Sequence, residues 1–304
     1  MKCKLCQKEF TEPAKFHKHL PSAHKMTMEK YYRTYYPRYD LLDGQNILFK
    51  SYDYYFTSLF NSRKNMVTYF KQNIDKGESI FRRLLNLRKL RKNLTSAPST
   101  VDSRTTLLPS PSMIYKLGMD YNAICASENL DIRFKYDKNV EIKIPKGLEI
   151  VVDTREQSPI DFLGVPSICS KLDFGDYSST SHFKRIFVER KSLSDLCGTL
   201  SKGFERFKKE AERCKEMKCN LLVMVESPLD DLLNLKNLGK GNFSQASSEF
   251  ICHRIREIAG EFSCLQFLFV QNRKEMADII PKILSFEGDF LSTDFQYLYD
   301  MRVL

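Results

Sequence analysis

The sequence predicts an α/β domain with a mixed or parallel sheet in its back half, preceded by a small metal-stabilised unit and a basic helical region. From residue 148 onward, short apolar runs typical of buried strands alternate with helical patterns. The first 24 residues carry Cys and His at metal-ligand spacing. Residues 1–95 contain 20 Lys and Arg against 8 acidic residues, a net charge of +12, whereas the rest of the 304-residue chain carries −2. A basic front on a near-neutral back favours a polyanion partner.

Composition excludes other classes. With 42% hydrophobic residues the chain can build a core, yet no run of about 18 apolar residues predicts a membrane span. The first ten residues lack the apolar stretch of a signal peptide. Nine Cys is an odd number, and most are scattered singly, which fits reduced thiols better than a disulfide framework. We therefore expect an intracellular protein, in the cytoplasm, nucleoid or nucleus depending on the host.

Residues 1–25 are predicted to form a ββα zinc finger. Cys3, Cys6, His19 and His24 give the spacing C-x2-C-x12-H-x4-H, with the Cys pair on a tight knuckle and the His pair about one helical turn apart. The segment is too short to fold without a metal, so Zn²⁺ is expected as a structural cofactor. The pattern resembles Cys2His2 fingers. That resemblance implies that helix residues Glu12, Lys15 and Lys18 face a major groove; a finger that braces the fold or binds a protein stays open.

Residues 26–95 are predicted to be a basic, Tyr-rich helical region. A first helix from Met28 should end near Pro37. Its Tyr stripe could stack on bases or, as we favour, pack into a core. A second helix over 79–94 could lie along a phosphate backbone, or be only a solvated face or a nuclear-import signal. Its basic residues are Arg82, Arg83, Arg88, Lys89, Arg91 and Lys92.

Two segments read as irregular. Residues 96–145 begin with a stretch dominated by Pro, Ser and Thr, without a helical or strand period, and are expected to be a linker and connector. Residues 287–304 are expected to be a C-terminal tail. Between these segments, residues 146–286 form the predicted α/β domain, with five strands in the stretches LEIVVD, SKLDFGDYSS, RIFVERK, CNLLVMVES and LQFLFVQ.

Carboxylates recur where these strands begin or end. Asp153 closes the first strand, Asp176 lies in the turn of the second, and Glu189 lies near the end of the third. If the ends converge, a hard divalent cation would make the three charges tolerable. Lys191 shares a strand face with Glu189 and can hold a water or offset charge on a phosphate. Taken singly, each carboxylate is more simply part of an ordinary salt bridge; the set indicates phosphodiester hydrolysis.

The same residues resemble a known family. Gly175–Tyr177 (GDY), followed by ERK-x3-D over Glu189–Asp195, resembles the G-D-x(n)-E-R-K-x3-D signature of XPF-type nucleases, and Val151–Glu156 (VVDTRE) is similar to the family's first strand and acidic loop. The resemblance implies a restriction-endonuclease-like nuclease core, a mixed sheet flanked by helices. It also implies Mg²⁺- or Mn²⁺-dependent cleavage of DNA near branch points or single/double-strand junctions.

The resemblance further implies residue roles. Asp153, Asp176 and Glu189 would be metal ligands, and Lys191 would serve the water and the phosphate. Three further residues would support the site or contact the substrate: Glu156, Arg190 and Asp195. Nuclease domains of this family often form homodimers or heterodimers through their last helices, here about 248–260 and 275–285.

One departure from the family limits what is carried over. Many relatives follow the nuclease with tandem helix-hairpin-helix motifs, and too few residues follow Phe286 for that. The finger and the basic front would then supply the DNA grip, an arrangement that suits a viral, phage or other mobile-element protein. Repair, recombination and attack on foreign DNA all fit, with RNA a less expected substrate. A catalytically inactive DNA-binding partner and a zinc-finger DNA-binding regulator remain the alternatives.

Overall fold

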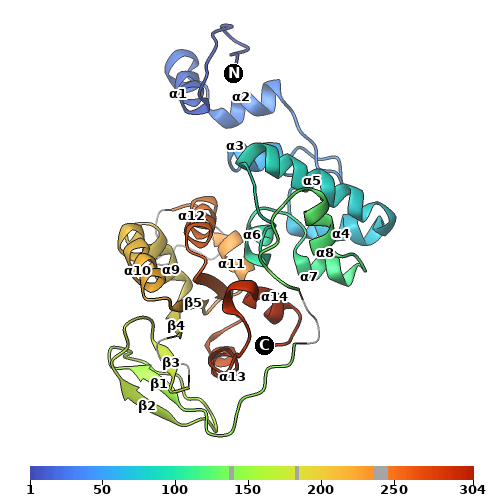
Figure 1. The fold of residues 1–304 in the computed structure, drawn as a ribbon. Helices are drawn as coiled ribbons and strands as arrows, with labels where there is room; N and C mark the ends of the chain where they lie inside the picture. Colours follow the sequence, from blue (N-terminus) through green and yellow to red (C-terminus); the bar gives the residue numbers. More distant parts are fainter. Residues whose placement is uncertain (137–139, 182–184, 236–245) are drawn as a thin grey trace.

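The α/β architecture expected for the back half is confirmed by the computed structural model, which describes residues 1–136, 140–181, 185–235 and 246–304 (Figure 1). Six strands form one mixed sheet with helices on both faces, and the front helices lie above it. Among the helices of these ranges, none combines the length and the apolar character that a membrane crossing requires.

The sheet has the strand order β2-β1-β3-β4-β5-β6. Strand β3 is antiparallel to both of its neighbours, and every other pair is parallel. Four strands match the predicted runs. The second prediction is corrected in part, because the strand β3 follows the turn at Gly175 and Asp176 instead of leading into it. Strand β2 is an additional edge strand that is largely exposed, so its residues lack the apolar pattern of the others. The strands are β1 (Ile150–Asp153), β2 (Ser167–Ser170), β3 (Tyr177–Ser179), β4 (Ile186–Lys191), β5 (Asn220–Val225) and β6 (Leu265–Phe269).

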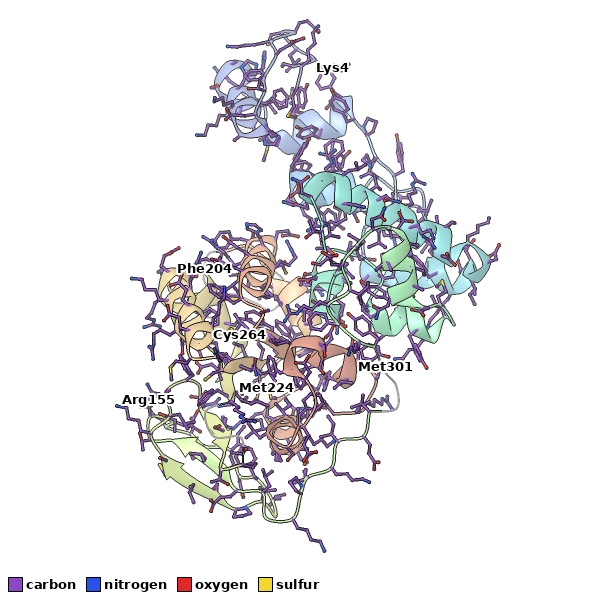
Figure 2. The ribbon with its side chains drawn as sticks, viewed as in Figure 1. Lys4, Arg155, Phe204, Met224, Cys264 and Met301 are labelled. Carbon is purple, nitrogen blue, oxygen red and sulfur yellow. The ribbon has the colours of Figure 1, made fainter. Side chains whose placement is uncertain are left out.

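Each face of the sheet has its own hydrophobic core. Strand β5 shows why its apolar run is uninterrupted: Leu221 and Val223 enter one core, whereas Leu222 and Met224 enter the other (Figure 2). The first core packs under α9 (Leu193–Leu200), α10 (Phe204–Glu216), α11 (Leu229–Leu233) and α12 (Ser248–Glu261). The second packs against α13 (Arg273–Leu284) and α14 (Phe295–Asp300).

The front of the chain is helical, as predicted, and its tyrosines pack inward. Tyr31 and Tyr32 are 0% and 2% exposed and join Phe16 and Leu20 of the finger in one core, so the packing interpretation of the Tyr stripe is correct for these two. The helices are α1 (Pro13–His24), α2 (Met28–Tyr35), α3 (Tyr52–Thr57), α4 (Arg63–Gln72) and α5 (Gly77–Lys92).

The expectation of a linker over 96–145 is corrected, because the first part of this segment forms helices that pack against the rest of the chain. It holds three short helices, α6 (Thr100–Thr105), α7 (Pro111–Lys116) and α8 (Tyr121–Ser127). The Thr100 N–H and the Tyr136 hydroxyl both donate to the buried carboxylate of Asp294, 2.7 and 3.2 Å away. Helices this short show no period, and Ser and Pro here are caps and first-turn residues rather than signs of an irregular chain.

The expected C-terminal tail is also corrected. Residues 287–304 include a 3₁₀ turn (Phe290–Ser292) and α14, and Phe295 is fully buried in the second core. The Gln296 side chain completes β6, since its Oε1 accepts from the Phe269 N–H at 2.8 Å and its Nε2 donates to the Phe269 carbonyl at 3.3 Å. This segment therefore belongs to the α/β domain.

Candidate active site and metal centre

The predicted carboxylates meet because three neighbouring strands end at the same place. Strands β1 and β4 flank β3 and run opposite to it, so the ends of the outer two lie beside the start of the middle one. In this register Val152 pairs with Tyr177, and Tyr177 pairs with Val188. The next residue toward this edge of the sheet is Asp153 on β1, Asp176 before β3 and Glu189 on β4, so Asp176 lies between the other two. The expected convergence of strand ends is therefore present.

Backbone contacts hold Asp176 in this position. Its N–H donates to the Val188 carbonyl at 2.8 Å, and its carbonyl accepts from the Asp153 N–H at 2.9 Å. Its carboxylate accepts from the Arg190 N–H at 2.7 Å. Gly175 makes the approach feasible, because it adopts φ +61° and a Cβ there would lie 2.8 Å from the Val188 carbonyl oxygen.

The carboxylates line a cavity of about 640 Å³ between the sheet and helix α10. Burial and the charge of Glu189 together raise the pKa of Asp176 to about 7. Lys191 enters the same cavity and donates from Nζ to Glu189 Oε1 at 2.7 Å. Asp176 resists ionisation beside a second carboxylate and one ammonium group, and a bound cation would stabilise its charged form.

Asp153 has a different environment from the one predicted. It is 1% exposed, and its carboxylate accepts from the Arg155 Nε at 2.7 Å and from the Leu172 N–H at 2.6 Å. Although burial opposes the effect, these hydrogen bonds lower the pKa of Asp153. Within the described residues, Asp153, Asp176 and Glu189 do not bring their oxygens close enough together to form a three-ligand group. Hard oxygen donors suit Mg²⁺ or Mn²⁺, and here Asp176 and Glu189 are the donors that Arg155 leaves available.

Sequence reasoning missed the opposite wall of the cavity. Helix α10 presents Arg206, Lys209, Arg213 and Glu210 to the carboxylates. Burial and the nearby charge of Glu189 raise the pKa of Glu210. Arg155 was missed too, although its place two residues after Asp153 was a signal. The α10 residues had no comparable signal, because their position depends on how that helix packs on the sheet.

Glu156 and Arg190 belong to a separate ion network beside the cavity. The Arg190 guanidinium contacts Glu156 at 3.1 Å and forms a close ion pair with Glu226. These contacts raise its pKa despite burial. Neither Glu156 nor Arg190 lines the cavity with its side chain; Arg190 reaches the site through its backbone N–H.

Asp195 lies at the start of α9, where it takes part in helix capping. Its N–H donates to the Ser192 hydroxyl at 3.1 Å, and that hydroxyl donates back to its carboxylate at 2.7 Å. It also lines a neighbouring cavity of about 520 Å³ together with Lys202, Arg206 and Lys191. The two cavities share Lys191 and Arg206, so the basic surface continues from one to the other.

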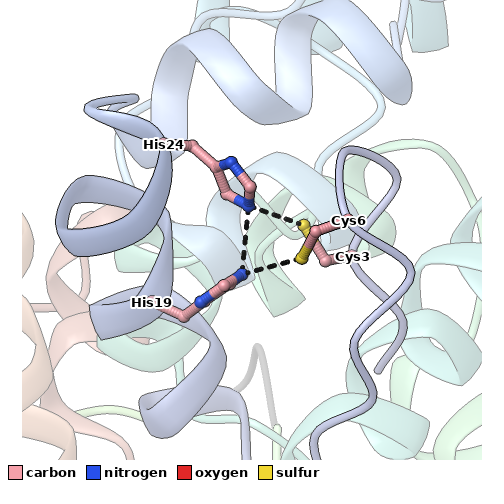
Figure 3. A group of neighbouring side chains, drawn as sticks. All are labelled: Cys3, Cys6, His19 and His24. Carbon is pink, nitrogen blue, oxygen red and sulfur yellow. Dashed lines mark hydrogen bonds between the residues drawn. The ribbon is translucent and has the colours of Figure 1, made fainter.

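The four Cys and His residues of the N-terminus do come together (Figure 3). Their ligand atoms all lie within 4.8 Å of one another. Cys3 Sγ is 3.5 Å from His24 Nε2, Cys6 Sγ is 3.3 Å from His19 Nε2, and the two imidazole nitrogens are 3.1 Å apart. Tetrahedral Zn²⁺ with bonds of about 2.0–2.3 Å would separate its ligands by roughly 3.3–3.8 Å, so the set fits that ion. His17 is elsewhere, within hydrogen-bond distance of the Tyr32 hydroxyl.

The basic residues predicted to contact nucleic acid have varied surroundings. In the finger, Lys15 and Lys18 are exposed, and Lys15 pairs with Glu12. On α5, Arg83 is exposed, whereas Arg88 is buried. The remaining four have partners in the chain: Arg82 pairs with Glu78 and Glu128, Lys89 with the Glu128 carbonyl, Arg91 with the rings of Tyr52 and Phe56, and Lys92 with Asp53.

Comparison with known proteins finds a family match within the back half and matches to two solved structures over less than half of the chain. No curated protein matches this chain. Two solved structures of XPF from Aeropyrum pernix match, one in complex with DNA (23% identity, TM-score 0.35, 45% of this chain and 62% of that chain) and one without (22%, 0.36, 46% and 66%). This chain therefore spans less than two thirds of either of them. Residues 152–283, which include the carboxylate cavity, match the ERCC4 domain, and this match supports an XPF-type nuclease domain in the back half.

Proposed function

We propose that this chain is a metal-dependent DNA endonuclease. The observation that carries the proposal is the cavity in which Asp176, Glu189 and Lys191 meet beneath the basic residues of α10, inside the segment that matches the ERCC4 domain. Asp176 and Glu189 would hold Mg²⁺ or Mn²⁺, with Asp153 placed beside them and oriented by Arg155. When bound, the metal would supply water activation and offset charge on the phosphate.

The chain's own residues would orient the substrate. Arg206, Lys209 and Arg213 line the cavity wall and would attract a phosphodiester. Lys191 would hold a water or a phosphate oxygen, and its ion pair with Glu189 fixes its head group 2.7 Å from that carboxylate. A substrate phosphate would therefore lie between the acidic strand ends and the basic helix.

Substrate choice is a finer part of the proposal. We infer that branched DNA or a single/double-strand junction is the substrate, with the zinc-loaded finger and the basic front directing the chain to it. The exposed Lys15 and Lys18 support a DNA contact by the finger. Zn²⁺ would be bound by Cys3, Cys6, His19 and His24.

A cleavage assay tests the enzyme. Labelled single-strand, duplex, flap, fork and four-way-junction DNA are incubated side by side with Mg²⁺ or Mn²⁺. The comparison uses the wild type, Asp176→Asn, and Asp161→Asn, an exposed carboxylate outside the cavity. We expect cutting of branched substrates by the wild type and Asp161→Asn, and loss of at least a hundredfold in Asp176→Asn. Equal cutting of every substrate would remove the junction preference. DNA binding without any cutting would instead support an inactive partner or a regulator.

A further inference from the structure

A second large cavity lies between the front helices and the α/β domain. It measures about 1160 Å³ and is lined by α3, α4, α5 and α6 on one side and by α11 and α12 on the other. It shares no lining residue with the carboxylate cavity. Seven Lys and Arg side chains line it against three carboxylates, so this interdomain cleft is strongly basic.

The three carboxylates of the interdomain cleft are already paired. They form ion pairs within the cleft: Lys92 with Asp53, Arg104 with Asp230 at 3.0 Å, and Lys50 with Glu249 at 4.0 Å. Four cations are left over: Arg63, Lys64, Arg88 and Arg256. For the described part of the chain, no carboxylate lies within ion-pair distance of any of these four.

Two of the leftover cations are shielded from water, Arg88 as a whole and Arg63 at one nitrogen. Arg88 is 9% exposed, and burial together with the charge of Arg256 lowers its pKa to about 10. Arg63 has a buried Nη1 without a hydrogen-bond partner among the described residues, and burial together with the charge of Arg104 lowers its pKa to about 10 as well. Arg88 is therefore a buried cation and Arg63 a partly buried one, and each lies next to another cation. Carboxylates offset this charge only from beyond ion-pair distance, so a bound anion would stabilise both guanidinium groups.

We propose that the interdomain cleft binds the phosphate groups of a single DNA strand, as a second nucleic-acid site separate from the carboxylate cavity. This proposal rests on the proposed function, because it takes DNA as the substrate. Arginine is the side chain best suited to phosphate, since its fork of N–H donors matches phosphate oxygens. Three of the leftover cations, Arg63, Arg88 and Arg256, are supplied by three different helices, α4, α5 and α12, and would contact successive phosphates.

Aromatic side chains in the same cleft favour a single strand over a duplex. Tyr54 and Phe250 both line it, and Phe250 is 39% exposed. Single-strand binding combines a basic groove for the backbone with rings on which unpaired bases stack, whereas the bases of a duplex already stack on one another. The cavity is also far larger than one phosphate group needs.

The test measures binding separately from cutting. The zinc-loaded full-length chain carrying Asp176→Asn is titrated against a fluorescein-labelled 15-nucleotide oligo-dT at several salt concentrations without Mg²⁺. Arg88→Gln and Arg256→Gln are compared with Lys71→Gln, which removes an equal charge from the exposed surface of α4 outside the cleft. Each cleft variant should weaken binding about tenfold and reduce the salt slope by about 0.7, whereas Lys71→Gln should stay within twofold.

Each outcome decides something. The melting temperature of Arg88→Gln without DNA should equal or exceed that of the parent protein, because an unpaired buried charge has been removed. If the cleft variants are folded by this criterion and still bind oligo-dT with unchanged affinity, the proposal is overturned. Competition by inorganic phosphate as strong as that by oligo-dT at equal phosphate concentration, or preference for duplex, would overturn the single-strand assignment. If the cleft variants lose binding while the wild type cuts no DNA, the cleft stands and the proposed endonuclease activity fails.

Discussion

Asp176 is the residue on which the candidate site depends most. Burial and Glu189 raise its pKa from the ordinary 3.8 to about 7. A carboxyl whose pKa is higher in the folded state binds its proton more tightly there, so the contribution of this group to folding stability is largest below pH 4 and is lost as the pH rises toward 7. A bound cation would reverse this penalty, because it favours the ionised form.

Asp176→Asn should therefore stabilise the metal-free protein at high pH. Asn cannot ionise and can still accept the Arg190 N–H, so the stability loss between pH 4 and 7 should disappear. We expect its melting temperature to match that of the wild type near pH 4 and to exceed it at pH 8. The corresponding gain in the free energy of unfolding at pH 8 is on the order of 2–4 kcal/mol. Calorimetry without added Mg²⁺ measures this, with zinc-free samples of both proteins at every pH, because protons displace Zn²⁺ from Cys and His near pH 4. Parallel pH curves for the two proteins would show that Asp176 is not perturbed.

The turn before Asp176 gives a second prediction at this scale. Gly175 and Gly164 both have positive φ, +61° and +80°, but only Gly175 is crowded. Gly164→Ala should cost about 1 kcal/mol from backbone strain alone. Gly175→Ala should cost at least about 2 kcal/mol more, because the new Cβ would push against the Val188 carbonyl and displace β4. Urea unfolding compares them; equal losses would mean that β4 adjusts without cost.

At the scale of elements, the strands that form the site could be predicted and several connecting elements could not. Strands β1, β4, β5 and β6 are apolar runs bounded by turn residues, so their pattern is visible in the sequence. Strand β2 was missed because an exposed edge strand need not be apolar. Helices α6, α7, α8 and α14 are 6 or 7 residues long, too short for a period to appear. Only tertiary packing identifies them.

The same distinction holds for the site. Asp176, Glu189 and Lys191 follow from strand ends and strand parity, which are local properties. That α10 closes the cavity with basic side chains depends on contacts between elements distant in sequence, whereas the pairing of Asp153 with Arg155 is local and was overlooked. Burial of Arg88 likewise could not be predicted from α5 alone, because its own charge pattern suggests an exposed face.

Helix α14 provides a prediction for an element that looked like a tail. Gln296 is 1% exposed and satisfies both backbone groups of Phe269. Gln296→Leu should leave these groups buried and unpaired, at a cost of about 2–4 kcal/mol. Gln271→Leu, on the exposed surface nearby, should change the stability by less than about 0.5 kcal/mol. Chemical unfolding measures the free energy of unfolding of both variants. A small loss of stability in Gln296→Leu would show that water replaces the contacts of the Gln296 side chain.

At the scale of the whole molecule, the proposed zinc finger of residues 1–25 is packed against the next helix and is not an independent domain. The Lys4 N–H donates to the Tyr31 hydroxyl at 2.9 Å, and the rings of Phe16 and Tyr31 are 5.4 Å apart (Figure 2). Finger and helix α2 therefore share a hydrophobic core. Loss of the proposed Zn²⁺ should disturb both, since a zinc finger of this size folds only with its ion.

Zinc removal should accordingly expose α2 to protease. We expect Cys6→Ser, or the wild type after chelation, to be cut by trypsin at Arg33 at least about tenfold faster than the zinc-loaded wild type. Cys169→Ser removes an exposed cysteine of β2 and should behave like the wild type. Mass spectrometry of the fragments locates the cuts. Cleavage confined to sites before Lys25 would show that α2 folds independently of the finger.

Helix α6 has a consequence for the products of the proposed reaction. It contacts both α12 and α14, and its Arg104 pairs with Asp230 and Asp300, so it fixes the interdomain cleft against the α/β domain. If a DNA strand is held in the interdomain cleft and cut in the carboxylate cavity, the fixed distance between the two sites sets the length of strand between the bound segment and the cut. The nucleotide count from the held segment to the cut should then be constant, whatever the length or sequence of the arm beyond it.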